Sequence, residues 1–224
     1  MVICLIRHAD PDYANDTLTP KGLAEAELLA RYLRDVPFTH IYCSPLERAQ
    51  ATMQPVLAGR DLLPVTLPWL AELDHRMGLG QAAWNVTCAQ LDADETLAAR
   101  ITEFMRPQQT QLLAKWDELM AEHGFCRTGR TYCRDVPVYP RRQLLAVFTH
   151  GGLLLTLLAG LFGLPLVQTY ACTVYLPTGI THLEMLRGGE GFCELRMLSL
   201  AARPHIHVSD QLMLARTGGA AAGK

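Results

Sequence analysis

The sequence predicts an α/β fold, a three-layer α/β/α arrangement in which a mostly parallel sheet lies between two layers of helices. Apolar runs of strand length alternate with stretches of helical periodicity along the chain. This alternation is typical of parallel sheets, because a helix usually makes the crossover between parallel strands. The chain has 224 residues, 50% hydrophobic and 19% charged, so it can bury one sizeable core. We expect one domain over residues 1–207 and a disordered tail over 208–224.

The first predicted strand, residues 2–6, presents Arg7 and His8 at its carboxyl end. Ligands bind at the carboxyl ends of the strands in open α/β sheets. A guanidinium beside an imidazole suits a phosphoryl group, because one is a permanent positive fork and the other a nucleophilic nitrogen. A helix is then expected after a short polar loop, since Thr19 can cap it and Pro20 fits its first turn.

The next two predicted strands also end beside charged side chains. Residues 38–43 lead through a turn to a helix start with Arg48 in its first turn. The short run 64–70 is followed by two carboxylates, Glu72 and Asp74. Because the ends of neighbouring parallel strands meet at one edge of a sheet, these groups are expected to converge on one phosphate.

Residues 73–142 are predicted to form a long insertion that covers the site, as insertions at this edge of a sheet often do. Its pattern over 94–123 is helical, and we expect Pro107 to divide it into two helices. Arginines crowd the end of the insertion. We interpret Arg141 and Arg142 as ligands for a second anionic group of the substrate, the alternative being solvated loop charges. The arginines of this stretch are Arg127, Arg130, Arg134, Arg141 and Arg142.

The last third of the chain predicts a strand at 144–149 that ends in His150 and Gly151. The apolar run 153–162 is shorter than the roughly 20 residues of a membrane-spanning helix. It therefore favours a buried helix over a membrane segment. Two late strands are predicted at 180–187 and 194–200.

Taken together, these segments resemble the histidine phosphatase superfamily, also called phosphoglycerate mutase-like. The resemblance covers about residues 1–200 and follows the order of the family's motifs. Ala9 stands where the family has Gly, and the stretch around Glu72 matches the family's acid motif only loosely. The motifs read Arg7-His8-Ala9, Leu18-Thr19-Pro20-Lys21-Gly22, Ser44-Pro45-Leu46-Glu47-Arg48-Ala49, Glu72 and His150-Gly151.

The resemblance implies a phosphate-binding site without a metal ion or cofactor. Arg7 and Arg48 are expected to clamp the phosphate, since a guanidinium fork donates two aligned hydrogen bonds to phosphate oxygens. His150, expected as an imidazolium, would bind a further oxygen together with Gly151. Cationic side chains would then stabilise the charge of the transferred group.

The resemblance also implies a catalytic pair. His8 is expected to be the nucleophile that forms a phosphohistidine, with its free nitrogen kept unprotonated by nearby positive charge. Glu72 is expected to protonate the leaving group and then to activate water. Asp74 is the rival for this role.

The predicted function is hydrolysis of a small phosphorylated metabolite. The short loop at 10–18 favours a phosphatase over a phosphoglycerate mutase-type transfer, and an inactive phospho-ligand-binding relative is the second alternative. The formal net charge of −2 gives no sign of a nucleic-acid partner. No membrane partner is expected, and a homodimer is left open.

The seven cysteines form no C-x-x-C pair, which argues against a zinc site or a disulfide scaffold. Cys4, Cys43, Cys172 and Cys193 lie in apolar, strand-like runs and are interpreted as reduced core thiols. Arg7 interrupts the first apolar run, so no signal peptide is indicated and the cytoplasm is the expected compartment.

Overall fold

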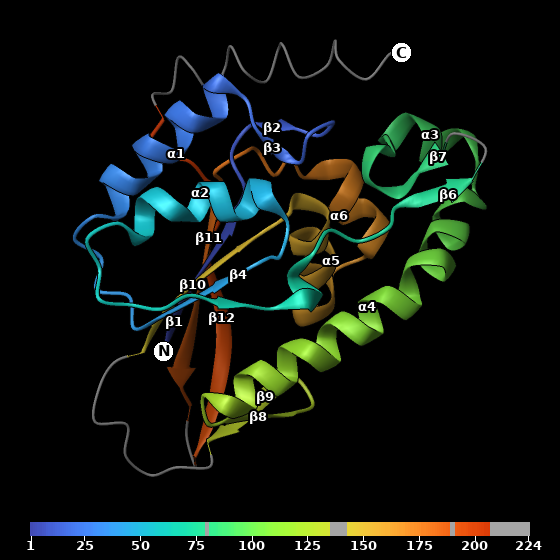
Figure 1. Ribbon diagram of the computed structural model, residues 1–224. Helices are drawn as coiled ribbons and strands as arrows, with labels where there is room; N and C mark the ends of the chain where they lie inside the picture. Colours follow the sequence, from blue (N-terminus) through green and yellow to red (C-terminus); the bar gives the residue numbers. More distant parts are fainter. Residues whose placement is uncertain (79–80, 135–142, 189–190, 207–224) are drawn as a thin grey trace.

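A computed structural model describes residues 1–78, 81–134, 143–188 and 191–206 (Figure 1). Its centre is an eight-stranded sheet. The strands of this sheet are β1 (Val2–Arg7), β4 (His40–Cys43), β5 (Val65–Thr66), β8 (Phe125–Thr128), β9 (Thr131–Arg134), β10 (Leu144–Thr149), β11 (Ile180–Arg187) and β12 (Phe192–Ala202). They lie in the order β5-β4-β10-β1-β11-β12-β9-β8. Two smaller sheets pair β2 (Pro11–Asp12) with β3 (Thr17–Leu18), and β6 (Arg76–Gly78) with β7 (Gln81–Ala82).

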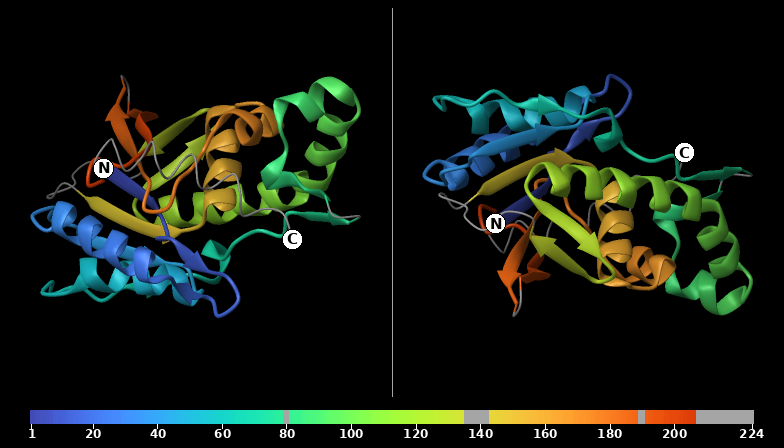
Figure 2. Two further views of the ribbon diagram at one scale, coloured as in Figure 1. Left: turned by 90° about the horizontal axis from the view of Figure 1, so that it is seen from above. Right: turned by 90° about the horizontal axis from the view of Figure 1, so that it is seen from below.

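Helices cover both faces of the central sheet (Figure 2). On one face lie α1 (Pro20–Leu33) and α2 (Glu47–Leu57), and on the other α4 (Leu97–Glu122) and α5 (Gly151–Phe162). The three-layer α/β/α prediction is therefore confirmed. The remaining elements are α3 (Cys88–Ala93), α6 (Leu166–Cys172) and the 3₁₀ turns η1 (Pro68–Leu70) and η2 (Ala83–Asn85).

The sheet is mixed, and its parallel half carries the predicted site. Strands β5, β4, β10 and β1 are paired in parallel. From β1 outward, β11, β12, β9 and β8 are paired antiparallel. The carboxyl ends of β1, β4 and β10 therefore lie together at one edge, as the sequence predicts.

Strand β1 shows why the first segment of the chain is apolar throughout. Side chains alternate between the faces of a sheet. Ile3 and Leu5 pack into the core beneath α4 and α5, while Cys4 and Ile6 pack into the core beneath α1 and α2. A strand buried on both faces reads as a continuous hydrophobic run rather than as an alternating one.

Helix α1 begins where the sequence predicts. The Thr19 hydroxyl accepts a hydrogen bond from the Gly22 N–H at 3.0 Å, and Pro20 occupies the first turn. A Cβ at Gly22 would collide with the Asp10 carbonyl oxygen. Glycine here therefore lets the helix start pack directly against the loop that follows His8.

The predicted break at Pro107 is wrong, because α4 continues through it as one helix of 26 residues. Both halves of α4 bury one continuous stripe against the core, including Ile101, Met105, Leu112 and Trp116. Proline removes one backbone hydrogen bond from a helix interior. The burial of the stripe on both sides of Pro107 offsets that loss.

The inserted segment between η1 and β10 packs against helices α5 and α6 and also adds two strands to the central sheet. Helix α3 and the turn η2 lie against α6, and α4 runs along α5. The β8–β9 pair extends the central sheet beyond β12. Within the described ranges, every helix is too short or too polar to cross a lipid bilayer.

Candidate active site

The ends of β1 and β10 bring two histidines together. Arg7 and Thr149 are register partners, and the His8 N–H donates to the Thr149 carbonyl at 2.9 Å. The rings of His8 and His150 are 5.1 Å apart between centroids. Both side chains are buried, with exposed fractions of 1% and 0%. The parallel register of the strands therefore builds this pair directly.

His8 is held in a form that can attack an electrophile. Its Nδ1 lies 2.7 Å from the Ala9 carbonyl oxygen. A carbonyl oxygen can only accept, so Nδ1 carries the proton and the lone pair of the neutral ring is on Nε2. The pKa of His8 is lowered to about 3. Burial is the largest cause, the charges of Arg7 and Arg48 act in the same direction, and the contact with the Ala9 carbonyl acts against them. Near neutral pH the ring is uncharged.

His150 is held by the second sequence motif. Its Nε2 lies 2.7 Å from the Ser44 hydroxyl oxygen, at the end of β4. Its Nδ1 is buried and has no hydrogen-bond partner among the described residues. Burial is the largest cause that lowers the pKa of His150, and together with interactions with His8, Arg48 and Arg7 it brings the pKa to about 2. The imidazolium expected from the sequence is therefore not the form that this ligand-free site favours.

Two arginines surround the histidine pair. Arg7 donates from Nη1 to the Tyr175 carbonyl oxygen, and Arg48 donates from Nη1 to the Asp16 carboxylate. The Nε atoms of both arginines are buried and have no acceptor in the described part of the chain. Both guanidinium charges act on His8 and on His150. The site thus holds fixed positive charge and unused donors around a neutral nucleophile.

The helix start after His150 lies against Arg7. We call Arg7, Arg48 and this first turn of α5 together the cradle. A Cβ at Gly151 would lie 3.2 Å from Arg7 Nε, so glycine lets the guanidinium lie close to the first turn of α5. The dipole of a helix makes its N-terminus favourable for an anion. Arg7 therefore packs against a helix end that also attracts negative charge.

Glu72 lies at the same helix start. Its carboxylate accepts hydrogen bonds from the N–H groups of Gly152 at 3.3 Å and Leu153 at 2.9 Å. Asp74 is exposed and pairs instead with Arg76, accepting from its N–H at 3.1 Å and from Nε at 3.2 Å. Of the two carboxylates considered from the sequence, only Glu72 contacts the helix that follows His150.

A comparison of sequences agrees with this geometry. The profile of the histidine phosphatase superfamily (branch 1) matches residues 3–196. The chain belongs to this superfamily. The adenosylcobalamin/alpha-ribazole phosphatase of Salmonella typhimurium is 28% identical over 223 residues, which cover 90% of this chain and 98% of that protein. The protein of the same description from Escherichia coli is 27% identical over 179 residues, covering 74% of this chain and 81% of that protein.

Solved structures show the same fold. A phosphoserine phosphatase from Entamoeba histolytica, in complex with 3-phosphoglyceric acid, superimposes with a TM-score of 0.64 at 18% identity, covering 91% of this chain and 98% of that chain. An alpha-ribazole phosphatase from Shigella flexneri gives a TM-score of 0.58 at 21% identity, covering 90% and 96%. The phosphoglycerate mutase-like fold expected from the motifs is thereby confirmed, and the superfamily match together with the phosphatase relatives supports phosphatase activity of this chain.

The loop between β2 and β3 contributes side chains to the phosphatase site that sequence reasoning missed. Asp16 accepts from Arg48 Nη1 and, at 2.9 Å, from the Glu47 N–H. The Tyr13 hydroxyl lies 3.5 Å from Arg7 Nη2, and its ring centroid lies 5.4 Å from Arg48 Cζ. This loop therefore contacts both arginines, although its residues match none of the motifs that carried the resemblance.

A buried network behind Glu72 was also missed. The Tyr170 hydroxyl donates to the Gly152 carbonyl oxygen at 2.8 Å. It also lies 2.7 Å from the Thr156 hydroxyl oxygen and 2.8 Å from His75 Nε2. A hydroxyl can donate once and accept twice, so Tyr170 satisfies all these groups. The network fixes the first turn of α5, which carries the contacts to Glu72.

Replacing Tyr170 with phenylalanine is expected to lower the free energy of unfolding by about 1–3 kcal/mol, because His75 and Thr156 lose a buried partner. Urea unfolding followed by circular dichroism measures the change. The exposed Tyr32→Phe is the matched control and should leave stability unchanged. Equal stability of the Tyr170 variant and the wild type would show that the network does not support this turn.

Acid is expected to destabilise the ligand-free phosphatase. Buried His8 and His150 have a pKa of about 3 and about 2, while histidines in the unfolded chain titrate near 6.5. Between these values the unfolded state binds more protons, so the free energy of unfolding falls as the pH falls. Each of the two histidines should contribute roughly 1.4 kcal/mol of loss between about pH 7.5 and 5.5.

Urea titrations at the two pH values test this expectation. His150→Gln should reduce the pH dependence by about the share assigned to His150. The same free energy of unfolding at both pH values would contradict the assignment of neutral, buried histidines.

The structure describes only some of the arginines at the end of the insertion. Arg141 and Arg142 are outside the described residues, so their predicted contact with substrate stays a prediction. Arg127 pairs with Asp117 at 2.7 Å in strand β8, at the edge of the sheet. Among the described residues, no three His, Cys, Asp or Glu side chains come together in a way that could hold a metal ion.

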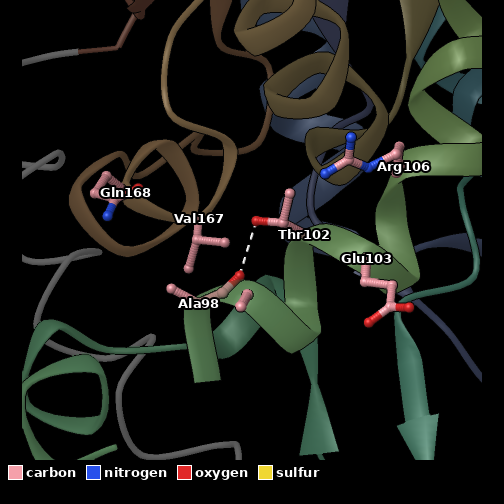
Figure 3. Close-up of a pocket in the computed structure, with 7 residues that line it drawn as sticks. Ala98, Thr102, Glu103, Arg106, Val167 and Gln168 are labelled. Carbon is pink, nitrogen blue, oxygen red and sulfur yellow. Dashed lines mark hydrogen bonds between the residues drawn. The ribbon is translucent and has the colours of Figure 1, made fainter. Parts of the chain in front are cut away.

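A separate pocket of about 610 Å³ lies between α4 and α6 (Figure 3). Thr102 donates to the Ala98 carbonyl at 2.8 Å on its α4 side, and Val167 and Gln168 face it from α6. None of the predicted site residues lines this pocket. It is therefore distinct from the histidine site.

Proposed function

We propose that this phosphatase hydrolyses the phosphomonoester of a small metabolite through a phosphohistidine on His8, without a metal ion. The observation that carries the proposal is a set of buried nitrogen atoms with no hydrogen-bond partner among the described residues, Arg7 Nε, Arg48 Nε and His150 Nδ1, close to a neutral His8. Such a set suits the several oxygens of one phosphate, since charged donors to anionic oxygens give strong hydrogen bonds.

In the first step the substrate phosphate enters the cradle between the two arginines and the start of α5. The phosphate oxygens accept from Arg7, Arg48 and His150. The dianion counters the positive charge that lowers the pKa of His150, so bound phosphate favours protonation of that ring. His8 Nε2 attacks phosphorus, the ester P–O bond breaks, and Glu72 gives its proton to the leaving alkoxide.

In the second step a water molecule replaces the departed alcohol. The Glu72 carboxylate takes a proton from this water as its oxygen attacks phosphorus, and the N–P bond to His8 breaks. Inorganic phosphate leaves, and His8 Nε2 regains its lone pair. The two steps share one cradle, because the arginines stabilise the same equatorial oxygens in both transition states.

Hydrolysis is favoured over a mutase reaction by the loop between β2 and β3. The loop is short, because β2 ends at Asp12 and β3 begins at Thr17. Its side chains Tyr13 and Asp16 contact Arg7 and Arg48, respectively. A mutase must keep a bound monoester in place of water during the second step. The names of the relatives in Salmonella and Entamoeba also favour a phosphatase, with α-ribazole phosphate and phosphoserine as the first substrates to test.

Phosphate release in the presence of EDTA tests the proposal. The panel is p-nitrophenyl phosphate, α-ribazole 5′-phosphate, phosphoserine and 3-phosphoglycerate. We expect release from the aryl ester and a higher kcat/KM for one of the metabolites. Isomerisation of 3-phosphoglycerate without release would favour the mutase alternative, and tight binding of phosphate without turnover would favour an inactive phospho-ligand-binding protein.

A further inference from the structure

Cys88 and Cys172 lie in contact on the surface, away from the histidine site. Cys88 is the first residue of α3 and Cys172 the last residue of α6. Their sulfur atoms are 3.7 Å apart although the residues are 84 positions apart in the chain, and both side chains are exposed. The prediction that Cys172 is a core thiol is therefore wrong. Its apolar run is the end of a surface helix, followed by the exposed Val174.

The other cysteines differ from this pair in access or in partner. Cys4, Cys43 and Cys193 are buried, and burial raises the pKa of the Cys4 and Cys43 thiols to about 12. Buried thiols of this kind are chemically inert. Cys126 is exposed, and the Sγ of its register partner Cys133 lies 3.1 Å from the Thr128 hydroxyl. Cys88 and Cys172 thus combine exposure with a sulfur–sulfur contact.

We propose that Cys88 and Cys172 are an oxidation site that a small-molecule disulfide of the glutathione type converts into an intramolecular disulfide. One protein thiolate attacks a sulfur of the reagent, the reagent's S–S bond breaks, and one reagent thiolate leaves. The second protein thiolate then attacks the protein sulfur of this mixed disulfide and releases the second reagent thiolate. Two electrons pass from the protein pair to the reagent, and the two released thiolates take up two protons.

The geometry favours closure over a lasting mixed disulfide. Sulfur atoms at 3.7 Å are in van der Waals contact, and a disulfide bond of about 2.05 Å requires a further approach of less than about 2 Å. Both side chains are exposed, and α3 is a helix of six residues at the surface. Side-chain rotation with a small shift of this helix suffices. The contact with Cys172 raises the pKa of Cys88, so closure should accelerate with rising pH.

A disulfide between Cys88 and Cys172 would link the inserted segment covalently to helix α6, which contacts the first turn of α5 through Tyr170. It joins α3 to α6, and α6 carries Tyr170, whose hydroxyl donates to the Gly152 carbonyl oxygen. A cross-link between distant positions stabilises chiefly by restricting the unfolded chain. We expect oxidation to raise Tm by about 5–10 °C. Hydrolysis of p-nitrophenyl phosphate should stay within about two-fold, because neither thiol contacts the residues assigned to the site.

Incubation of the whole protein with oxidised glutathione tests the proposal. After free thiols are alkylated, intact mass spectrometry should show a species lacking two hydrogens, and digestion should give one peptide pair joined through Cys88 and Cys172. Cys88→Ser and Cys172→Ser should each abolish this species and the rise in Tm. The exposed Cys126→Ser is the matched control and should retain both.

Stable glutathione adducts on Cys88 or Cys172 without closure would overturn the proposal. A bridge through another cysteine, or a Tm that does not change when the Cys88–Cys172 peptide pair forms, would overturn it as well. Because both serine substitutions are at exposed positions, the reduced variants should keep the Tm of the reduced wild type. That comparison separates loss of the bridge from a folding defect.

Discussion

Replacing His8 with alanine is expected to lower kcat for phosphomonoester hydrolysis by roughly 10⁴-fold or more, because the reaction loses its nucleophile. Ring nitrogen Nε2 of His8 carries the lone pair, and burial, together with the charges of Arg7 and Arg48, lowers the pKa of His8 and keeps the ring neutral. Initial rates with p-nitrophenyl phosphate measure the change. Activity of the variant within ten-fold of the wild type would show that another group attacks phosphorus.

The same variant separates catalysis from binding. The clamp of Arg7, Arg48 and His150 remains in it, so the Kd for inorganic phosphate, measured by calorimetry, should change far less than kcat. The exposed His40→Ala is the matched control for loss of an imidazole and should retain full activity. A large loss of phosphate affinity in the His8 variant would instead indicate a collapsed site.

Replacing Glu72 with glutamine is expected to slow an alkyl phosphate by about 10²–10⁴-fold, the usual contribution of a general acid or base. The loss should be much smaller for p-nitrophenyl phosphate if formation of the phosphohistidine limits the rate, because its phenolate leaves without a proton. Glutamine keeps one side-chain oxygen, which can accept from the Leu153 N–H as Oε1 of Glu72 does at 2.9 Å, whereas the longer bond from the Gly152 N–H to Oε2, at 3.3 Å, is lost. The shorter of the two hydrogen bonds to α5 is therefore retained while the titratable group is lost.

Two further variants show which role Glu72 has. Glu72→Ala also removes the contacts to α5, so a lower Tm in this variant alone would measure the structural part. Asp74→Asn should have no effect, because Asp74 is exposed and paired with Arg76. When formation of the phosphohistidine is rate-limiting for both substrates, an equal loss for alkyl and aryl esters in Glu72→Gln would mean that Glu72 acts through the helix start and not as a proton donor.

The parts of the site that the sequence predicted are those that local patterns determine. Arg7 is the last residue of β1, His8 and His150 directly follow β1 and β10, and Arg48 and Gly151 lie in the first turns of the helices that come next. Parallel pairing of β4, β10 and β1 then brings them together. Burial of these strands is visible in the sequence as apolar runs, so both the fold class and the meeting of these groups could be predicted.

The parts that could not be predicted depend on contacts between distant segments. Tyr170 meets His75 across 95 positions, and nothing in either local sequence signals the contact. Asp16 accepts a hydrogen bond from Arg48 because of the conformation of its loop, in which Asp16 has a positive φ of 49°. No periodic pattern of the sequence predicts this loop conformation. Pro107 and Cys172 were misjudged for the same reason, because packing of α4 and the position of α6 override local preference.

Trapping of the phosphoenzyme shows directly whether His8 carries the phosphoryl group during turnover. Wild-type protein would be quenched in alkali within its first turnovers on a labelled phosphomonoester, then digested and mapped by mass spectrometry. We expect an acid-labile, alkali-stable phosphoryl group on His8, which forms as fast as the first alcohol is released and disappears when substrate is exhausted. Label on His150, or steady turnover with no label on any histidine, would contradict the account.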